Sequence, residues 1–347
     1  MTLDTEFRRY DLPLDEQFTI ARGSTDEKGI VVVRISDGVH EGVGAAAPLA
    51  HYGETAATVE AVLPDLLAVV EDVDDPHARQ RIERRLDAVV GDNPAAKSGV
   101  TTALADLVAK RCGLPLYRLW GLDPGSVPPT SYTVSITDPE TMADRAAARV
   151  EAGFDVLKLK VGTDIETDRE RVAAVREAAP GATVRVDANG GYTPREAVAA
   201  SEWLAELGVE FLEQPVPDTD HEGLGYVHDH SAVPVAVDES CVTASDVARV
   251  ADRCDIAVVK LAKCGGPWAA RRHLQTARAH DLETMLGCMV ESNASLAPAM
   301  HLAPLADYAD LDGSLLLDSD PFEGVPFEAG RPDLAAFDRP GSGARER

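Results

Sequence analysis

The chain has 347 residues, of which 45% are hydrophobic, and this is enough for a large core and usually for more than one domain. The formal net charge is −26, from 33 basic and 59 acidic residues, and a field of that sign repels nucleic acid and anionic lipid. The composition therefore argues against a nucleic-acid or membrane-binding protein.

The N-terminal sequence, Met1-Thr-Leu-Asp-Thr-Glu6, carries acids early and lacks the apolar core of a signal peptide. The sequence has no run of about 18 uncharged apolar residues that could span a membrane. We therefore expect a cytoplasmic protein. The five cysteines show no CxxC spacing, which indicates reduced thiols rather than a disulfide framework or a zinc site.

Residues 1–125 have the pattern of a separate α+β unit. A strand is expected at 30–36, followed by a hairpin turn signal at Asp37-Gly38. Helical spacing follows, and the expected helices are 55–73, 76–90 and 98–112. We expect this unit to be a small sheet followed by helices.

From about residue 126 strands and helices alternate with a period of roughly 25 residues, repeated about eight times, which is typical of a closed (β/α) barrel. The expected strands are 131–135, 156–160, 184–187, 209–213, 235–238, 256–260, 284–289 and 308–311. A doubly wound open sheet is the alternative, but even spacing favours closure. We assign 126–325 to the barrel and 326–347 to a C-terminal tail that packs back on the first unit.

The segment Val156-Leu-Lys-Leu-Lys160 alternates apolar and cationic residues with the period of a strand. Lys158 and Lys160 therefore lie on one face. Crowding and burial both disfavour the charged form, so a lysine here is expected to have a lowered pKa, suited to a base. An exposed edge strand with solvated lysines is the alternative for this segment taken alone.

Charged residues stand at the ends of successive expected strands, where barrels carry their chemistry. They are Lys160, Asp187, Glu213, Asp238 and Lys260, followed by Glu291, Asp310 and Asp312. Three converging carboxylates repel one another without a counter-ion, and an all-oxygen set suits Mg²⁺. Two lysines that face each other across the metal suit epimerisation or racemisation. One lysine removes the α-proton of a carboxylate substrate, which gives a metal-stabilised enolate, and the other returns a proton to the opposite face.

The motifs that carry a family resemblance are Lys158-Leu-Lys160, Asp187-Ala-Asn189, Glu213-Gln-Pro215, Asp238-Glu-Ser240 and Lys260-Leu-Ala-Lys263-Cys-Gly-Gly266. Because these motifs occur in this order and at these spacings, the chain resembles the muconate-lactonising subgroup of the enolase superfamily over essentially its whole length. The resemblance implies an N-terminal α+β capping domain on a (β/α)₇β TIM-type barrel, and a homo-oligomer. It implies that Asp187, Glu213 and Asp238 bind Mg²⁺ and that Lys160 and Lys260 are the catalysts. Lys158 is then a supporting cation, and Lys263 is either supporting or a solvated loop lysine.

Within the subgroup the sequence is most similar to dipeptide epimerases such as the L-Ala-D/L-Glu epimerases. Asp310 and Asp312 resemble the pair that binds a dipeptide's free α-ammonium in that family, and Arg22 resembles the loop arginine that binds the carboxylate of a substrate's Glu side chain. The segment that contains Cys288, Met289, Glu291 and Ser292 resembles the epimerase seventh-strand segment, so these residues are expected at the substrate. Strand-end capping is the alternative for the two aspartates, and a surface arginine for Arg22.

Other functions remain as alternatives. An N-succinylamino acid racemase, an o-succinylbenzoate synthase or a muconate cycloisomerase shares the same catalytic groups. A strand-end lysine could instead form a Schiff base with a carbonyl substrate, as in aldolases, although this leaves the carboxylates without a role. A metabolite-binding protein without activity is a third class.

Acidic residues are spread along the whole chain and aromatic residues make up only 5% of it, which favours adaptation to a halophilic host. Because salt screens the self-repulsion, we expect a larger free energy of unfolding in molar salt than in low salt, measured by refolding in both. Equal stability in the two conditions would indicate an acidic protein without this adaptation.

Overall fold

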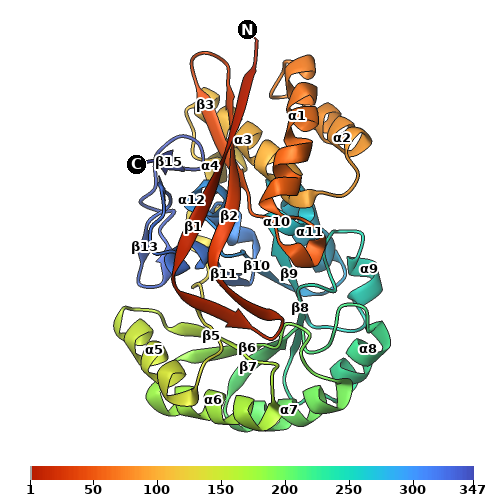
Figure 1. Ribbon diagram of the computed structural model, residues 1–347, viewed down its shortest axis with the longest axis vertical. Coiled ribbons are helices and arrows are strands. Elements are labelled where there is room, and N and C mark those ends of the chain that lie inside the picture. Colours follow the sequence, from red (N-terminus) through yellow and green to blue (C-terminus); the bar gives the residue numbers. More distant parts are fainter. Residues whose placement is uncertain (1) are drawn as a thin grey trace.

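The computed structural model describes residues 2–347 and places an N-terminal sheet with helices above the mouth of a barrel (Figure 1). The sheet is antiparallel with the order β1-β2-β3, and its strands are β1 (Asp4–Ile20), β2 (Gly23–Ser36) and β3 (Glu41–Ala46). The helices of this part are η1 (Ala50–Tyr52), α1 (Ala56–Val73), α2 (Arg79–Val89), α3 (Pro94–Cys112), α4 (Leu116–Leu119) and η2 (Pro124–Ser126). Their buried faces form a core of their own against β2.

The barrel is an eight-stranded parallel sheet whose spatial order follows the chain from β4 to β11. Its strands are β4 (Tyr132–Val134), β5 (Val156–Lys160), β6 (Thr183–Asp187), β7 (Val209–Glu213), β8 (Val235–Val237), β9 (Ile256–Lys260), β10 (Glu283–Gly287) and β11 (Tyr308–Asp310). A parallel bridge between Thr130 and Ala309, with a hydrogen bond from the Ser131 amide to the Ala309 carbonyl, joins the last strand to the first. The sheet is therefore closed, as predicted, and the open-sheet alternative is wrong.

Helices cover the outside of the barrel, and α5 to α9 form its lower arc in Figure 1. They are α5 (Pro139–Glu151), α6 (Ile165–Ala178), α7 (Pro194–Glu206), α8 (His221–His230), α9 (Val247–Val250), α10 (Leu261–Cys264), α11 (Pro267–Ala279) and α12 (Asn293–Met300), with the turns η3 (Ala303–Leu305) and η4 (Gly313–Leu316). No α-helix follows β11, so the barrel has the predicted (β/α)₇β form. Among residues 2–347, no helix is long and apolar enough to cross a membrane.

The inward-facing positions of the barrel strands combine an apolar cluster with two buried cations, Lys158 and Arg185, in the lower layers, and they are charged at the carboxyl ends. Phe211, Val258 and Met285 pack inside the barrel as one small cluster. Since strand side chains alternate with period two, Glu213 and Lys260, two residues further along β7 and β9, point to the same interior. The sequence pattern that ends each strand in a charge thus becomes a charged layer at the mouth.

Strand β1 was not expected from the sequence. Its 17 residues include Arg8, Arg9 and Pro13, and most are partly or fully exposed, so no apolar alternation marks it. It is a strand because it pairs antiparallel with the buried β2 from Asp4 to Ile20, with a register shift between Pro13 and Phe18. The β1–β2 hairpin is long enough to reach down to the barrel strands (Figure 1).

The C-terminal tail packs against both parts of the chain. Its short strands are β13 (Phe327–Glu328), β14 (Arg331–Pro332) and β15 (Arg345–Glu346), and β15 pairs with β12 (Phe322–Glu323), which precedes the tail. The Ser342 amide donates to the buried Asp106 carboxylate of α3, and the Gly341 amide donates to the Leu114 carbonyl. These contacts tie the tail to the N-terminal unit.

Candidate active site

A cavity of about 450 Å³ lies between the N-terminal unit and the carboxyl ends of the barrel strands. The N-terminal unit contributes residues of the β1–β2 hairpin and of the 49–52 loop, and the barrel contributes strand-end residues. Of the predicted site residues, those that line it are Arg22, Lys160, Asp238, Lys260, Cys288, Met289, Asp310 and Asp312. The structure thus brings together residues that lie almost 300 positions apart in the chain.

Strand register places the predicted catalytic and acidic residues at one level of the barrel. Lys160 is the register partner of Asp187, which in turn is the partner of Glu213. On the other side, Lys260 is paired with Gly287 and Gly287 with Asp310. Because β5 and β9 are four strands apart in an eight-stranded closed sheet, Lys160 and Lys260 approach the cavity from opposite sides.

Lys158 is the centre of a buried ion cluster below the cavity. Only 1% of its surface is exposed, and its Nζ lies 2.7 Å from Asp310, 2.8 Å from Glu213 and 3.3 Å from Asp187. Burial disfavours its charge, but the carboxylates of Asp310, Glu213 and Asp187 outweigh this and raise its pKa well above the ordinary value. The expected lowering of the pKa by crowding is therefore wrong for Lys158, because the three carboxylates outweigh burial and the neighbouring Lys260 ammonium.

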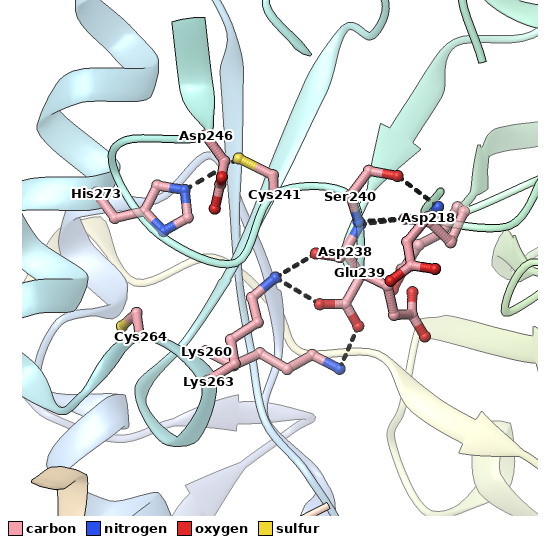
Figure 2. Close-up of polar contacts among 12 residues, drawn as sticks. Asp218, Asp238, Glu239, Ser240, Cys241, Asp246, Lys260, Lys263, Cys264 and His273 are labelled. Carbon is pink, nitrogen blue, oxygen red and sulfur yellow. Dashed lines mark hydrogen bonds and ion pairs between the residues drawn. The ribbon is translucent and has the colours of Figure 1, made fainter. Parts of the chain in front are cut away.

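The other three barrel lysines also hold carboxylates (Figure 2 shows two of them). Lys160 lies 2.5 Å from Asp187, and Lys260 lies 2.7 Å from Asp238. Lys263 is fully buried, and its Nζ donates to both the backbone carbonyl and the carboxylate of Asp238 at 2.6 Å. Lys263 is therefore not the solvated loop lysine of the alternative interpretation; it fixes Asp238 from behind.

The three predicted metal ligands differ in their electrostatics. Burial opposes ionisation of Asp187 and Asp238, but Lys160 and Lys260 respectively hold their pKa values below the ordinary range. Burial and the neighbouring Asp187 raise the pKa of Glu213 to about 8, although Lys158 opposes the shift. The three acids are thus close enough to repel, as the sequence predicted, and the lysines are their counter-ions in this structure.

The donor chemistry of the trio fits a hard divalent cation. All three offer carboxylate oxygens, and the buried Oδ1 of Asn189 beside them has no hydrogen-bond partner, whereas Oε2 of Glu213 contacts the Lys158 ammonium at 2.8 Å. Among residues 2–347, however, no three acid, histidine or cysteine side chains form a ready-made metal cage. The lysines occupy the carboxylates instead, so a cation at this place would take over contacts that the ammonium groups now make.

Asp310 is the last residue of β11 and Asp312 follows the strand, and the two carboxyl groups differ in their partners. Asp310 accepts from Lys158 and from the Ser131 hydroxyl at 2.6 Å, and these contacts lower its pKa against the effect of burial. Asp312 accepts the Thr133 amide at 2.6 Å but has no ion pair, and burial and Asp310 raise its pKa to about 7. Asp312 is therefore the acid that more readily takes a new cation.

Arg22 extends from the β1–β2 hairpin into the cavity, with 31% of its side chain exposed. Its guanidinium donates to Glu239 at 2.5 Å and to the Asn189 carbonyl at 2.6 Å. Glu239 lies beside Asp238 in Figure 2. The arginine thus connects the N-terminal unit to two barrel loops, and its charge is already neutralised there.

In the segment after β10, the first residues line the cavity and the later ones are buried behind the cavity wall. Cys288 and Met289 line the cavity, and the Cys288 sulfur accepts the Gly313 amide at 3.3 Å. Glu291 and Ser292 are buried and are not part of the cavity lining. Glu291 accepts the Met289 amide, while the Ser292 hydroxyl caps α12 and donates to Asp320. The structure therefore does not bring these two expected substrate residues to the cavity.

The sequence reading assigned no role to several residues that the structure places at the site. Asn189 and Glu239 lie in the motifs Asp187-Ala-Asn189 and Asp238-Glu-Ser240, next to the expected metal ligands, and this position could have identified them as site residues. Lys28 lines the cavity from β2 and carried no signal. Behind Asp238, the Cys241 sulfur and the His273 Nε2 lie 3.2 Å apart, fully buried (Figure 2). Burial lowers the pKa of His273 to about 3, so this imidazole is neutral.

Two family comparisons cover most of the chain. Residues 5–121 match the family described as mandelate racemase / muconate lactonizing enzyme, N-terminal domain. Residues 141–345 match the family described as enolase C-terminal domain-like. The chain belongs to the mandelate racemase / muconate lactonizing enzyme family of the enolase superfamily. This confirms the resemblance on which the sequence analysis relied.

Relatives within this family are named as epimerases. The chain is 39% identical to a hydrophobic dipeptide epimerase of Roseobacter litoralis, covering 93% of each sequence. It is 35% identical to an L-Ala-D/L-Glu epimerase of Bacteroides thetaiotaomicron, over 97% of this chain and 86% of the relative. The crystal structure of a dipeptide epimerase from Enterococcus faecalis V583, complexed with Mg and L-Leu-L-Tyr, matches with a TM-score of 0.92 at 33% identity over 99% of each chain. The predicted enzyme class, an epimerase, is confirmed by these relatives.

Replacing Lys158 with methionine should destabilise the fold, because Asp187, Glu213 and Asp310 would then share one buried volume with less positive charge. We expect a loss of about 3 to 5 kcal/mol in the free energy of unfolding for Lys158→Met, measured by urea unfolding with a chelator present. The control is Arg169→Met, which breaks an ion pair between the exposed Arg169 and Glu206 and should cost less than about 1 kcal/mol. Equal losses in the two variants would contradict the cluster's role.

Proposed function

We propose that this protein is a Mg²⁺-dependent dipeptide epimerase that inverts the α-carbon of the C-terminal residue of a dipeptide. The observation that carries the proposal is the placement of Lys160 and Lys260 on opposite sides of one cavity, with three carboxylates between their strands. Inversion of a carbon needs a proton removed from one face and a proton supplied to the other. Two lysines so placed meet that requirement.

In this proposal Asp187, Glu213 and Asp238 hold the metal. Bound Mg²⁺ supplies positive charge that stabilises the substrate carboxylate as the α-carbon loses its proton. Lys263 keeps the Asp238 carboxylate in place through its two 2.6 Å contacts. Lys158 keeps Asp310 ionised and orients the Glu213 carboxyl group beneath the cavity.

The proton transfers are assigned to the two cavity lysines. For one diastereomer the neutral amine of one lysine takes the α-proton, and the α-carbon becomes planar. The ammonium of the opposite lysine then donates a proton to the other face, and the two lysines exchange roles in the reverse direction. Each lysine is a group whose removal is expected to lower the rate by about 10²- to 10⁴-fold.

The far end of the cavity suits the α-ammonium of a dipeptide. Asp310 and Asp312 both line the cavity, and the pKa of Asp312 has been raised by burial and by Asp310, a shift that a cation reverses. A substrate without an ammonium, such as an N-succinylamino acid, would leave this buried acid without a charge partner. The acids therefore favour a dipeptide over the other substrates of the subgroup.

The structure removes one argument from the sequence analysis. Arg22 was expected to bind an acidic second residue, but its guanidinium already pairs with Glu239. Because Arg22 already has this carboxylate partner, it gives no reason to expect a preference for glutamate at the second position of the dipeptide. We extend the proposed substrates to dipeptides with a neutral second residue.

The test is proton NMR of L-Ala-L-Ala and L-Ala-L-Glu with the enzyme and Mg²⁺ in D₂O at high salt. We expect the α-proton signal of the second residue to disappear and the L,D diastereomer to appear. A chelator should stop the reaction and added Mg²⁺ should restore it.

Single substitutions sharpen this test. Lys160→Ala and Lys260→Ala should each slow inversion by about 10²- to 10⁴-fold, while the lysine that remains can still exchange the α-proton of one diastereomer with solvent. Loss of exchange for both diastereomers in both variants would contradict the two-lysine assignment. Inert dipeptides combined with a racemised N-succinylamino acid would identify the alternative function.

The pH dependence should report on Asp312. This acid binds an ammonium only when ionised, so kcat/KM for a dipeptide should fall about tenfold per pH unit as the pH drops below about 7. The loss should appear mainly in KM, because bound ammonium keeps the acid ionised in the complex. Steady-state kinetics from pH 5.5 to 8.5 would measure it.

The matched variant is Asp312→Asn, which keeps the shape but cannot ionise. We expect a raised KM at every pH and loss of the part of the acid limb due to Asp312. A wild-type pH profile retained in Asp312→Asn would assign the limb to another group. Unchanged kcat/KM for the dipeptide in this variant would remove the argument for an ammonium site.

A further inference from the structure

Lys28 is a basic residue of the cavity wall to which no role has been assigned. It is placed by β2, where it pairs in register with Leu12, and its side chain is partly buried and lines the cavity. Its Nζ donates to the Pro48 carbonyl at 2.5 Å. A lysine on an inner strand of a capping sheet, held by one carbonyl, is available to a ligand in the cavity below.

Lys28 differs from every other cation at this cavity. Arg22, Lys160 and Lys260 each have a carboxylate partner within 2.7 Å. Within residues 2–347, by contrast, Lys28 forms no ion pair, although Glu291 is the acid that acts most strongly on it. Burial and Lys260 lower its pKa to about 8 while Glu291 opposes the shift, so the ammonium still predominates at pH 7.

The neighbours of Lys28 indicate which part of a dipeptide it would meet. The groups that influence the Lys28 ammonium are Lys260, the last residue of β9, and Glu291, which follows β10. Arg22, by contrast, contacts the loops after β6 and β8. In the proposed function the reacting residue lies between Lys160 and Lys260, with its carboxylate over the acids of β6 to β8. The first residue must then extend toward β10 and β11, where its ammonium meets Asp312. Its side chain is the part of the substrate next to the β10 wall.

We propose that Lys28 binds an anionic side chain on the first residue of the dipeptide, and that it makes this enzyme selective for an amino-terminal Asp or Glu. The inference rests on the proposed epimerase function and names its substrate class. A carboxylate at this place would give the ammonium its only ion-pair partner. It would also balance the repulsion from Lys260.

The experiment compares kcat/KM at pH 7 for four dipeptides, L-Glu-L-Ala, L-Gln-L-Ala, L-Ala-L-Glu and L-Ala-L-Gln. Glutamine is the neutral isostere of glutamate, so each Glu/Gln ratio isolates the charge. We expect the wild-type ratio at the first position to be about tenfold or more, as a charge-assisted hydrogen bond provides. Lys28→Met should bring this ratio close to one, and Lys28→Arg should keep it.

Arg169→Met, on the surface of α6, is the control that should leave both ratios unchanged. A wild-type ratio near one at the first position would overturn the inference, as would a high ratio that survives in Lys28→Met. A Glu preference found only at the second position and lost in Lys28→Met would overturn the assignment to the first residue. If neither these dipeptides nor L-Ala-L-Ala is epimerised with Mg²⁺, the proposed function fails and this inference fails with it.

Discussion

The structure depends on one electrostatic constraint, which is the mutual neutralisation of buried lysines and carboxylates at the mouth of the barrel. Lys158, Lys160, Lys260 and Lys263 each lie within 2.7 Å of a carboxylate oxygen, and none is more than 7% exposed. Neither set of charges could be buried alone, because an isolated charge in a protein interior costs several kcal/mol. Closing the sheet through Thr130 and Ala309 brings Asp310 to Lys158 and completes the set.

The same arrangement prepares the site for chemistry. Lys158 and Lys263 have no place in the cavity lining, and they hold the carboxylates from below and behind. Lys160 and Lys260 line the cavity and are partly free to face a substrate. The proposed division into supporting and reacting lysines thus follows from the depth of each side chain in the barrel. The N-terminal unit then covers the mouth and adds two cations, Arg22 joined to the barrel and Lys28 unpaired.

The barrel and its charged layer could be predicted from sequence because both depend on local alternation. Strands β5, β7 and β9 begin and end at the predicted residues, since each is an apolar run that ends in a charge. What the sequence did not show depends on tertiary contacts. Strand β1 is defined by its partner rather than by its own pattern, Arg22 pairs with a glutamate more than 200 positions away, and Ser292 caps a helix and donates to Asp320.

The central claim is that three carboxylates hold Mg²⁺ while two lysines stand on opposite faces of the reacting carbon. A crystal structure of the protein with Mg²⁺ and an epimerised pair of dipeptides tests this most directly. The account predicts the metal among oxygens of Asp187, Glu213 and Asp238 and of the substrate carboxylate, with the Nζ atoms of Lys160 and Lys260 on either side of the α-carbon. A metal bound elsewhere, or both lysines on the same face, would contradict it.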